Sequence, residues 1–306
     1  MPTGGFRLFR LFGVDVFLHW TWLIAAGVVF KLSEGKYSSP AWMVAEYLTL
    51  FGIVLLHEFG HTFACRSVGG TANRIVLWPL GGLAYVDPPP RPGAVLWSIA
   101  AGPLVNVVLV PVTVIGLAVS TAAGTGSPDI HRYFVAVAYI NASLLIFNLL
   151  PIYPLDGGQI LHALLWFIIG RARSLAVTSV IGVLGALGLG ALAVLGEDWW
   201  LLLIAFFAIS QAFRGFQQAK ALRRLAEAPR HDDLACPSCN ASPLRGPYWS
   251  CDQCGTAFDT FEHKAVCPNC FARFRTTKCP NCHRVHPIDA WIATAEPAEP
   301  LDVHPA

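Results

Sequence analysis

Charged residues are scarce in this sequence. Only 13% of its 306 residues are Asp, Glu, Lys or Arg, whereas 55% are hydrophobic and the mean hydropathy is +0.53. A soluble domain of this size normally has about 25% charged residues. The composition therefore excludes an ordinary soluble protein and predicts a polytopic membrane protein that is all-α in its membrane part.

The C-terminal part of the chain also lacks a surplus of basic residues. Residues 230–306 contain seven Lys or Arg against nine Asp or Glu, which gives this part a net charge of minus two. Proteins that bind nucleic acid use positive charge to neutralise phosphates, and this segment has no excess of positive charge. Nucleic acid is therefore not an expected partner.

Six apolar runs are long enough to cross a lipid bilayer as helices. They are residues 14–29, 42–65, 95–119, 133–150, 175–195 and 199–213. An even number of spans puts both termini on one side, and Arg66, Arg91 and Arg171 are among the basic residues that favour the cytoplasm as that side. The sequence predicts an integral protein of the cytoplasmic membrane with both termini cytoplasmic. The first run lacks a convincing small-residue cleavage site and is expected to be retained.

A metal-binding pattern, His57-Glu58-Phe59-Gly60-His61, lies inside the second apolar run. On a helix the two histidines lie on one face and can share a zinc ion, while Glu58 can polarise a water at that ion. Ionisable side chains at bilayer depth are costly and are usually functional. The pattern therefore predicts a hydrolytic zinc site that is submerged near the cytoplasmic side.

A catalytic zinc needs a third protein ligand in addition to an open position for water. Asp156 is the candidate, because Pro151 and Pro154 break the apolar run after Asn148 and place this acid at the start of a new helix. Capping of that helix is the alternative role for Asp156. Asn106 is another polar residue at depth, and an interhelix hydrogen bond is expected for it.

A glycine- and proline-rich segment separates the second run from the third. It interrupts two short apolar pieces, residues 75–78 and 83–86, and predicts a membrane-associated β-hairpin. Unpaired backbone is costly in lipid, so the hairpin should rest on protein or line a cavity. One hypothesis is that it holds an unwound substrate as an extended strand.

The two motifs together resemble the site-2 protease family of intramembrane zinc metalloproteases. The resemblance rests on the histidine motif and on Asn148-Leu149-Leu150-Pro151-Ile152-Tyr153-Pro154-Leu155-Asp156-Gly157, and covers roughly residues 6–215. It implies His57, His61 and Asp156 as zinc ligands, Glu58 as general base and Asn148 as a residue that orients the substrate backbone. Many relatives have an arginine where this chain has Gln159, which puts a role for that arginine in doubt.

Eight of the nine cysteines form four Cys-x-x-Cys pairs, which is typical of structural zinc sites. The pairs are Cys236/Cys239, Cys251/Cys254, Cys267/Cys270 and Cys279/Cys282. If neighbouring pairs combine, they form two closed four-thiolate sites that resemble a double zinc ribbon. A crossed arrangement, a histidine ligand (His263, His283 or His286) and iron in place of zinc remain open. Disulfides are disfavoured on a reducing side of the membrane, and Cys65 stands alone.

These features predict four parts: a metalloprotease domain (1–215), an amphipathic helix with a linker (216–234), tandem zinc ribbons (235–292) and a disordered tail (293–306). The expected function is regulated cleavage of membrane-anchored proteins in the bilayer, with one catalytic and two structural zinc ions. The ribbons are expected to bind a cytoplasmic protein. The alternatives are a non-enzymatic membrane receptor or scaffold with structural zinc sites, and a hydrolase for another membrane substrate such as a lipidated peptide.

Overall fold

The computed structural model describes residues 5–78, 81–122, 128–153, 155–282 and 284–291. Contacts between Cα atoms divide the chain into two compact units, Met1–Gln217 and Gln218–Ala306. The predicted disordered tail and His283 lie outside the described residues.

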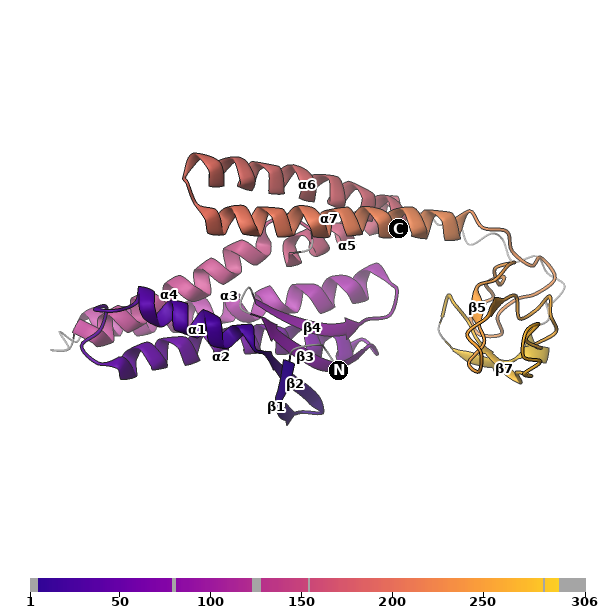
Figure 1. Cartoon of the computed structure of the whole chain (residues 1–306), viewed down its shortest axis with the longest axis horizontal. Coiled ribbons are helices and arrows are strands. Elements are labelled where there is room, and N and C mark those ends of the chain that lie inside the picture. Colours follow the sequence, from indigo (N-terminus) through magenta and orange to yellow (C-terminus); the bar gives the residue numbers. More distant parts are fainter. Residues whose placement is uncertain (1–4, 79–80, 123–127, 154, 283, 292–306) are drawn as a thin grey trace. The chain divides into compact units, whose positions relative to one another are not determined.

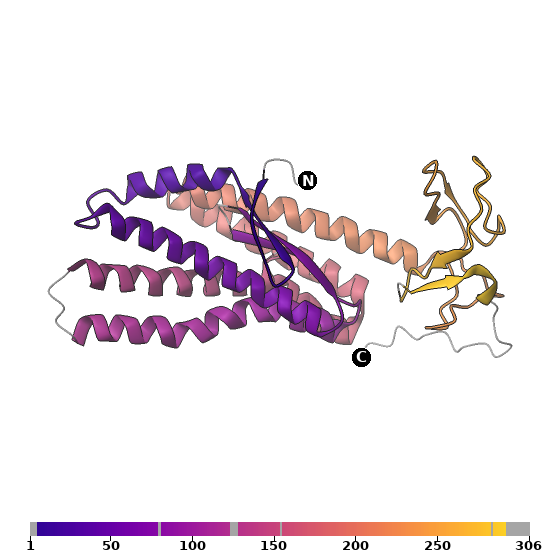
Figure 2. The ribbon, with the colours of Figure 1, turned by 90° about the horizontal axis from the view of Figure 1, so that it is seen from below.

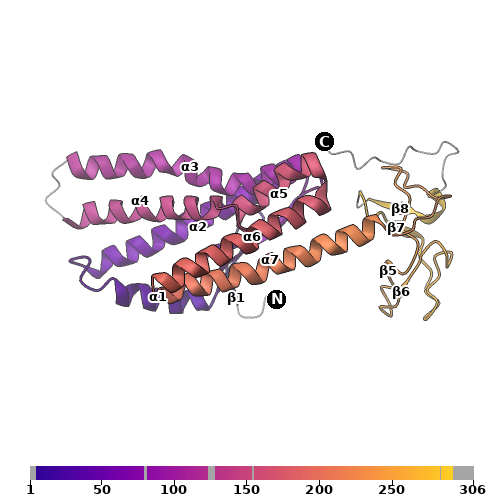
Figure 3. The ribbon, with the colours of Figure 1, turned by 90° about the horizontal axis from the view of Figure 1, so that it is seen from above.

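Helices make up most of the first unit (Figure 1). They are α1 (Thr21–Leu32), α2 (Pro40–Ser67), α3 (Pro92–Ala122), α4 (Pro128–Leu149), α5 (Asp156–Ile169), α6 (Arg171–Leu195) and α7 (Trp199–Ala226). Helices α2, α3 and α4 contact one another, as Figure 2 shows, and Figure 3 shows α5 beside α6. Within the described residues, α2, α3, α4 and α6 are long and apolar enough to cross a membrane, while α1 and α5 are shorter apolar helices.

The predicted span over residues 14–29 is wrong as a continuous helix. Its first part, Val14–His19, is strand β2, and only the second part belongs to α1. Val14 and Val16 are fully buried and alternate with less buried residues, which is the pattern of a strand with one face on a core. At the other end of the unit, the polar stretch from Gln217 continues α7 to Ala226 instead of forming a separate helix.

A four-stranded sheet lies against α2. Strands β1 (Gly5–Leu11) and β2 are antiparallel, β2 runs parallel to β3 (Thr71–Trp78), and β3 is antiparallel to β4 (Gly81–Asp87). The predicted hairpin is confirmed as β3 and β4, but it is only half of a larger sheet. Strand β4 is the last in the order, so within the part of the chain that the structure describes one of its edges is not paired with another strand.

Arg66, at the C-terminal end of α2, holds the sheet in place. Its guanidinium donates hydrogen bonds to the carbonyl oxygens of Phe12 (2.6 Å), Ala72 (2.9 Å) and Gly13 (3.2 Å). Phe12 and Gly13 form the β1–β2 turn with φ of 50° and 74°, so their carbonyls point to the arginine rather than into a ladder. Apolar side chains of the sheet then pack on α2 in one core cluster: Val14, Val16, Ile75 and Leu77 with Val54 and Phe59.

The predicted break after Asn148 is present as a sharp elbow between α4 and α5. Helix α4 ends at Leu149 and α5 begins at Asp156. A Cβ atom on Gly157 would lie 2.3 Å from the carbonyl oxygen of Leu149, so only glycine permits this close return of the chain. The elbow thereby brings Asp156 back toward the other helices.

The second unit has little regular structure. Beyond the last turns of α7, which ends at Ala226, its described elements are two short hairpins, β5 (Trp249–Ser250) with β6 (Ala257–Phe258) and β7 (Thr276–Lys278) with β8 (Val285–Pro287), and a 3₁₀ turn at Ile288–Ala290. The two small core clusters of this unit are built around its cysteines, so cross-links at these cysteines would contribute much of its stability. Below, residues 230–291 are called the cysteine module.

Candidate metal centres

Three buried side chains converge where α2, α3 and α5 meet. His57 and His61 come from the middle of α2, and Asp156 is the first residue of α5. The two Nε2 atoms lie 3.1 Å apart, and Oδ2 of Asp156 lies 3.0 Å from Nε2 of His57 and 3.4 Å from Nε2 of His61. The structure thus brings together all three ligands predicted for the catalytic zinc.

Hydrogen bonds on the far side of each ring fix which nitrogen carries the proton. Nδ1 of His57 lies 2.6 Å from Oδ1 of Asn106, and Nδ1 of His61 lies 2.9 Å from the carbonyl oxygen of Ser98. Both partners are oxygens that only accept, so each Nδ1 must donate and each Nε2 is left with a lone pair. In neutral rings, the short contacts to Asp156 are therefore not ion pairs.

This arrangement fits a zinc ion. Three lone-pair atoms face one another, and Oδ2 of Asp156 is buried without a hydrogen-bond donor among the described residues. A cation would bind the three lone pairs and would also compensate the buried carboxylate oxygen of Asp156. Zinc bound at about 2.0–2.2 Å to tetrahedral nitrogen and oxygen ligands separates those ligands by about 3.3 Å, close to the spacing of the three atoms.

Gly102 of α3 keeps the space beside the two rings open. A Cβ atom built at this position would lie 2.2 Å from Nε2 of His61 and 2.9 Å from Nε2 of His57. Both nitrogens are the ones that face Asp156. Any side chain larger than glycine would therefore displace the rings from the positions in which they face Asp156.

Glu58 lies next to this group and against the free edge of β4. Its Oε2 accepts a hydrogen bond from the backbone N–H of Ala84 at 2.8 Å. A Cβ on Gly82 would lie 2.3 Å from Cγ of Glu58, so the glycine allows the strand to come this close. The carboxylate is thus held between the metal-ligand cluster and a strand edge.

Asn148 and Asn106 have different surroundings. Asn148 lies half-buried in the last turn of α4, before the elbow that leads to Asp156, and its role toward a substrate stays a prediction. Asn106 makes the expected interhelix hydrogen bond, to Asn141 of α4, and also contacts His57. Sequence reasoning missed Asn141, the Ser98 carbonyl and the Ala84 N–H; for Asn141 the available signal was a lone amide inside an apolar run.

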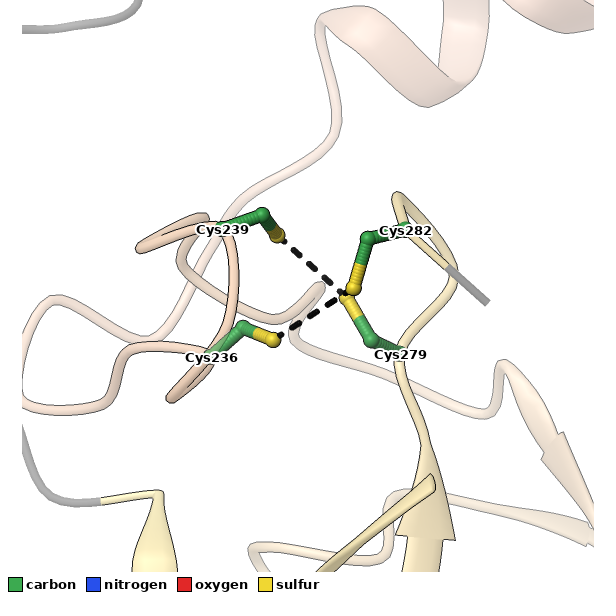
Figure 4. A group of neighbouring side chains, drawn as sticks. All are labelled: Cys236, Cys239, Cys279 and Cys282. Carbon is green, nitrogen blue, oxygen red and sulfur yellow. Dashed lines mark hydrogen bonds between the residues drawn. The ribbon is translucent and has the colours of Figure 1, made fainter. Parts of the chain in front are cut away.

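The eight paired cysteines form two groups of four. Cys236, Cys239, Cys279 and Cys282 form the outer group (Figure 4), and Cys251, Cys254, Cys267 and Cys270 form the inner group. Sulfur atoms lie 3.7 and 3.8 Å apart across the outer group and 3.5 and 3.6 Å apart across the inner group. Disulfide bonds of about 2.05 Å are excluded, while four thiolates at about 2.3 Å from zinc would be spaced at about 3.8 Å.

The predicted tandem arrangement, in which the first motif combines with the second and the third with the fourth, is therefore wrong. The crossed alternative, first with third, is wrong as well. The first pair combines with the fourth and the second with the third, so one site is nested inside the other. Two small cores enforce this order: Phe258 packs with Cys251 and Cys267, whereas Trp291 packs with Cys236 and Cys279. Among the described residues, which do not include His283, no histidine belongs to either group, and His286 instead contacts Ser238 at 2.9 Å.

Asp259 ties the beginning of the cysteine module to its inner part. Its buried carboxylate accepts hydrogen bonds from the N–H groups of Gly246 and Phe261 at 2.7 and 2.9 Å, and lies 2.9 Å from Nε2 of His231. Burial alone would raise the pKa of Asp259, but these hydrogen bonds outweigh burial and hold the pKa below its usual range. The ionised carboxylate of Asp259 is therefore the form that holds these segments together.

Fold and site together define a helical membrane protein with a buried His–His–Asp cluster that fits a metal ion, a glutamate beside it and a separate module with two four-cysteine clusters. Residues 45–126 and 113–191 match peptidase family M50. A zinc metalloprotease of Methanocaldococcus jannaschii is 32% identical over 203 residues, covering 66% of this chain and 57% of the relative. Stage IV sporulation protein FB of Bacillus subtilis is 36% identical over 38% of this chain and 39% of the relative.

The structure agrees with these matches. A solved structure of a site-2 protease from Methanocaldococcus jannaschii superposes with a TM-score of 0.50 at 28% identity, covering 69% of this chain and 95% of that one. The chain belongs to peptidase family M50, the family of site-2 proteases. It spans less than two thirds of the length of the curated relatives it matches.

Proposed function

We propose that this protein is an intramembrane zinc endopeptidase that cleaves membrane-anchored proteins in or near their transmembrane segments. The observation that carries the proposal is the position of Glu58, between the His57–His61–Asp156 cluster and the free edge of β4. A site that only held a structural metal would be closed by a fourth protein ligand and would need no carboxylate at the open position. Both termini on the cytoplasmic side remain part of this proposal.

His57, His61 and Asp156 would hold the zinc ion, which supplies Lewis acidity to water and to the peptide carbonyl. Glu58 takes a proton from the attacking water as the water oxygen bonds to the carbonyl carbon. When the carbon–nitrogen bond breaks, the same carboxyl group gives this proton to the leaving amine. Asn148 would orient the substrate backbone, as the family resemblance implies.

The free edge of β4 can hold the substrate as an additional strand. The N–H of Ala84 points away from β3 to Glu58, so the N–H groups of Gly82 and Val86 point to the same free edge. A substrate helix must unwind before its peptide bond can be reached, and main-chain hydrogen bonds to β4 would stabilise the unwound segment. A substrate segment bound in this way would lie beside Glu58.

Val86→Pro tests the strand edge. The substitution removes one outward N–H and leaves the ladder to β3, so we expect kcat/KM for a transmembrane substrate to fall about tenfold, the effect of one hydrogen bond of about 1.4 kcal/mol. Bound zinc should not change. Val86→Thr keeps the N–H and a β-branched side chain, and is the matched control. Equal cleavage by the proline and threonine variants would rule out strand addition at this edge.

Glu58→Gln tests the function itself. We expect the variant to bind zinc normally and to lose about 10²- to 10⁴-fold in hydrolysis, because the proton acceptor is gone while its shape is kept. Comparing the membrane proteomes of cells that make the wild type or the variant should reveal single-span proteins that accumulate only with the variant. Matching cut ends in the wild type would identify the substrate. Identical proteomes under several stress conditions would instead support the receptor or scaffold function.

For the cysteine module, we propose two structural zinc ions, one in each four-cysteine group, and binding of a cytoplasmic protein that recruits or regulates the protease. Closed thiolate sites supply folding free energy and leave no open coordination position for chemistry. Affinity capture with the wild-type module and with a Cys251→Ser variant tests this role. A partner retained equally by both would show that the folded module is not what it recognises.

A further inference from the structure

Two asparagines form a buried pair behind His57. Asn106 of α3 and Asn141 of α4 have no exposed surface. Nδ2 of Asn106 donates to Oδ1 of Asn141 at 2.9 Å, and Nδ2 of Asn141 donates to the backbone carbonyl of Asn106 at 3.1 Å. Oδ1 of Asn106 faces His57 on the other side.

These contacts determine the orientation of both amides. The backbone carbonyl of Asn106 can only accept, so Asn141 must turn its Nδ2 toward it and its Oδ1 toward the Asn106 side chain. Asn106 must then present Nδ2 to Asn141 and Oδ1 to His57. The imidazole donates from Nδ1, and its lone pair on Nε2 faces Asp156. A backbone carbonyl of α3 thus decides the tautomer of His57 through two side chains.

His61 does not depend on such a relay. Its Nδ1 donates directly to the backbone carbonyl of Ser98, which has no alternative orientation. An asparagine amide alone would not fix the ring of His57, because a half turn of the amide exchanges its donor and its acceptor. With Nδ2 of Asn106 toward the ring, His57 would keep its proton on Nε2, where it would block metal binding. Asn141 prevents this exchange.

We propose that Asn141 is a positioning residue of the metal centre, which acts through Asn106 to keep Nε2 of His57 available as a ligand. The inference rests on the zinc site proposed above. Groups that orient a metal-binding histidine typically change metal affinity by about 10- to 100-fold when they are removed. Within the described residues, Asn141 hydrogen-bonds to Asn106 and not to the histidine, so its effect on zinc affinity would have to pass through Asn106.

The test uses the full-length chain, loaded with zinc in detergent or liposomes, and measures zinc loss to a chelator. Asn141→Leu keeps the side-chain volume and removes both hydrogen bonds; Asn141→Ala is a second variant in case the first folds poorly. Thr113→Val is the matched control, because it removes the hydrogen bond that the buried Thr113 side chain donates to the Val110 carbonyl of α3. Asp156→Ala reports the zinc held by the cysteine module alone.

We expect zinc affinity at the centre to fall 10- to 100-fold in Asn141→Leu and at least as much in Asn106→Leu, with no change in Thr113→Val. The zinc concentration for half-maximal proteolysis should rise by the same factor. Unchanged affinity in both Asn141 variants, or a loss equal to that of Thr113→Val, would overturn the inference. If Asp156→Ala retained all the zinc of the wild type, the proposed zinc site itself would be wrong.

Discussion

Replacing Gly102 by alanine should remove the catalytic zinc and abolish proteolysis without unfolding the protein. The added methyl group would lie 2.2 Å from Nε2 and 2.3 Å from Cε1 of His61, so the imidazole would have to leave the position in which it faces Asp156. The ring cannot swing away without breaking its hydrogen bond to the Ser98 carbonyl. The methyl group and the metal therefore exclude each other.

The prediction is specific to the metal site because helix propensity by itself favours alanine over glycine. Alanine is favoured over glycine inside a helix by about 1 kcal/mol, so the substitution by itself should not destabilise α3. We expect Gly102→Ala to keep the helical content of the wild type and to lose one metal equivalent. The measurements are circular dichroism, zinc content and cleavage of a reconstituted substrate.

Gly52→Ala on α2 is the matched control for Gly102→Ala. A Cβ at Gly52 meets no atom within 4 Å, so this variant should keep its zinc and its activity. If Gly102→Ala retained the zinc content of the wild type, the metal would have to lie elsewhere than between His57, His61 and Asp156. If it lost zinc together with its helical signal, the effect would be one of folding and not of the site.

The parts of the site that the sequence predicted correctly depend on local geometry. His57 and His61 share a helix face because four residues make about one turn, and this relation holds wherever the helix lies. Asp156 was accessible to the same reasoning, since prolines end a helix in a predictable place. The hairpin formed by β3 and β4 also follows from turn residues beside short apolar pieces.

The parts that the sequence did not predict depend on contacts between distant segments. Strand β2 pairs in parallel with β3, although all of α1 and α2 lies between them in the sequence. The apolar residues of β2 are followed almost directly by those of α1, so the hydrophobic pattern alone predicts one long membrane span. The relay from Asn141 to His57 joins α4 to α2 through α3. No local spacing encodes such a contact.

The same limit explains the cysteine pairing. Each Cys-x-x-Cys motif is a local signal for one half of a metal site, but which second motif completes the site depends on how the chain folds. Phe258 and Trp291 make this choice by packing with different cysteines. The intervals between the motifs are compatible with several pairings, so spacing could not distinguish the nested arrangement from the tandem one.

The nested arrangement predicts that the two cysteine sites are unequal. Cys251, Cys254, Cys267 and Cys270 all lie in the chain between the two halves of the outer site, and this inner segment has its own core around Phe258. The inner site can therefore fold without the outer one. The outer site must close around the inner segment, and an unfolded insert would raise the entropic cost of that closure and remove the packing that guides it.

Cys267→Ser should consequently release both zinc ions of the cysteine module, whereas Cys282→Ser should release only one. The effect is large because a structural zinc contributes about 10–16 kcal/mol of binding free energy to folding. Zinc content and the thiolate charge-transfer band of the cobalt-substituted protein measure the two sites, and Cys65→Ala, outside the module, should retain both. A Cys267→Ser protein that kept the outer metal would show that the outer site folds independently. In that case a partner could bind the outer site while the inner one is empty, and regulation through the module would not require both metals.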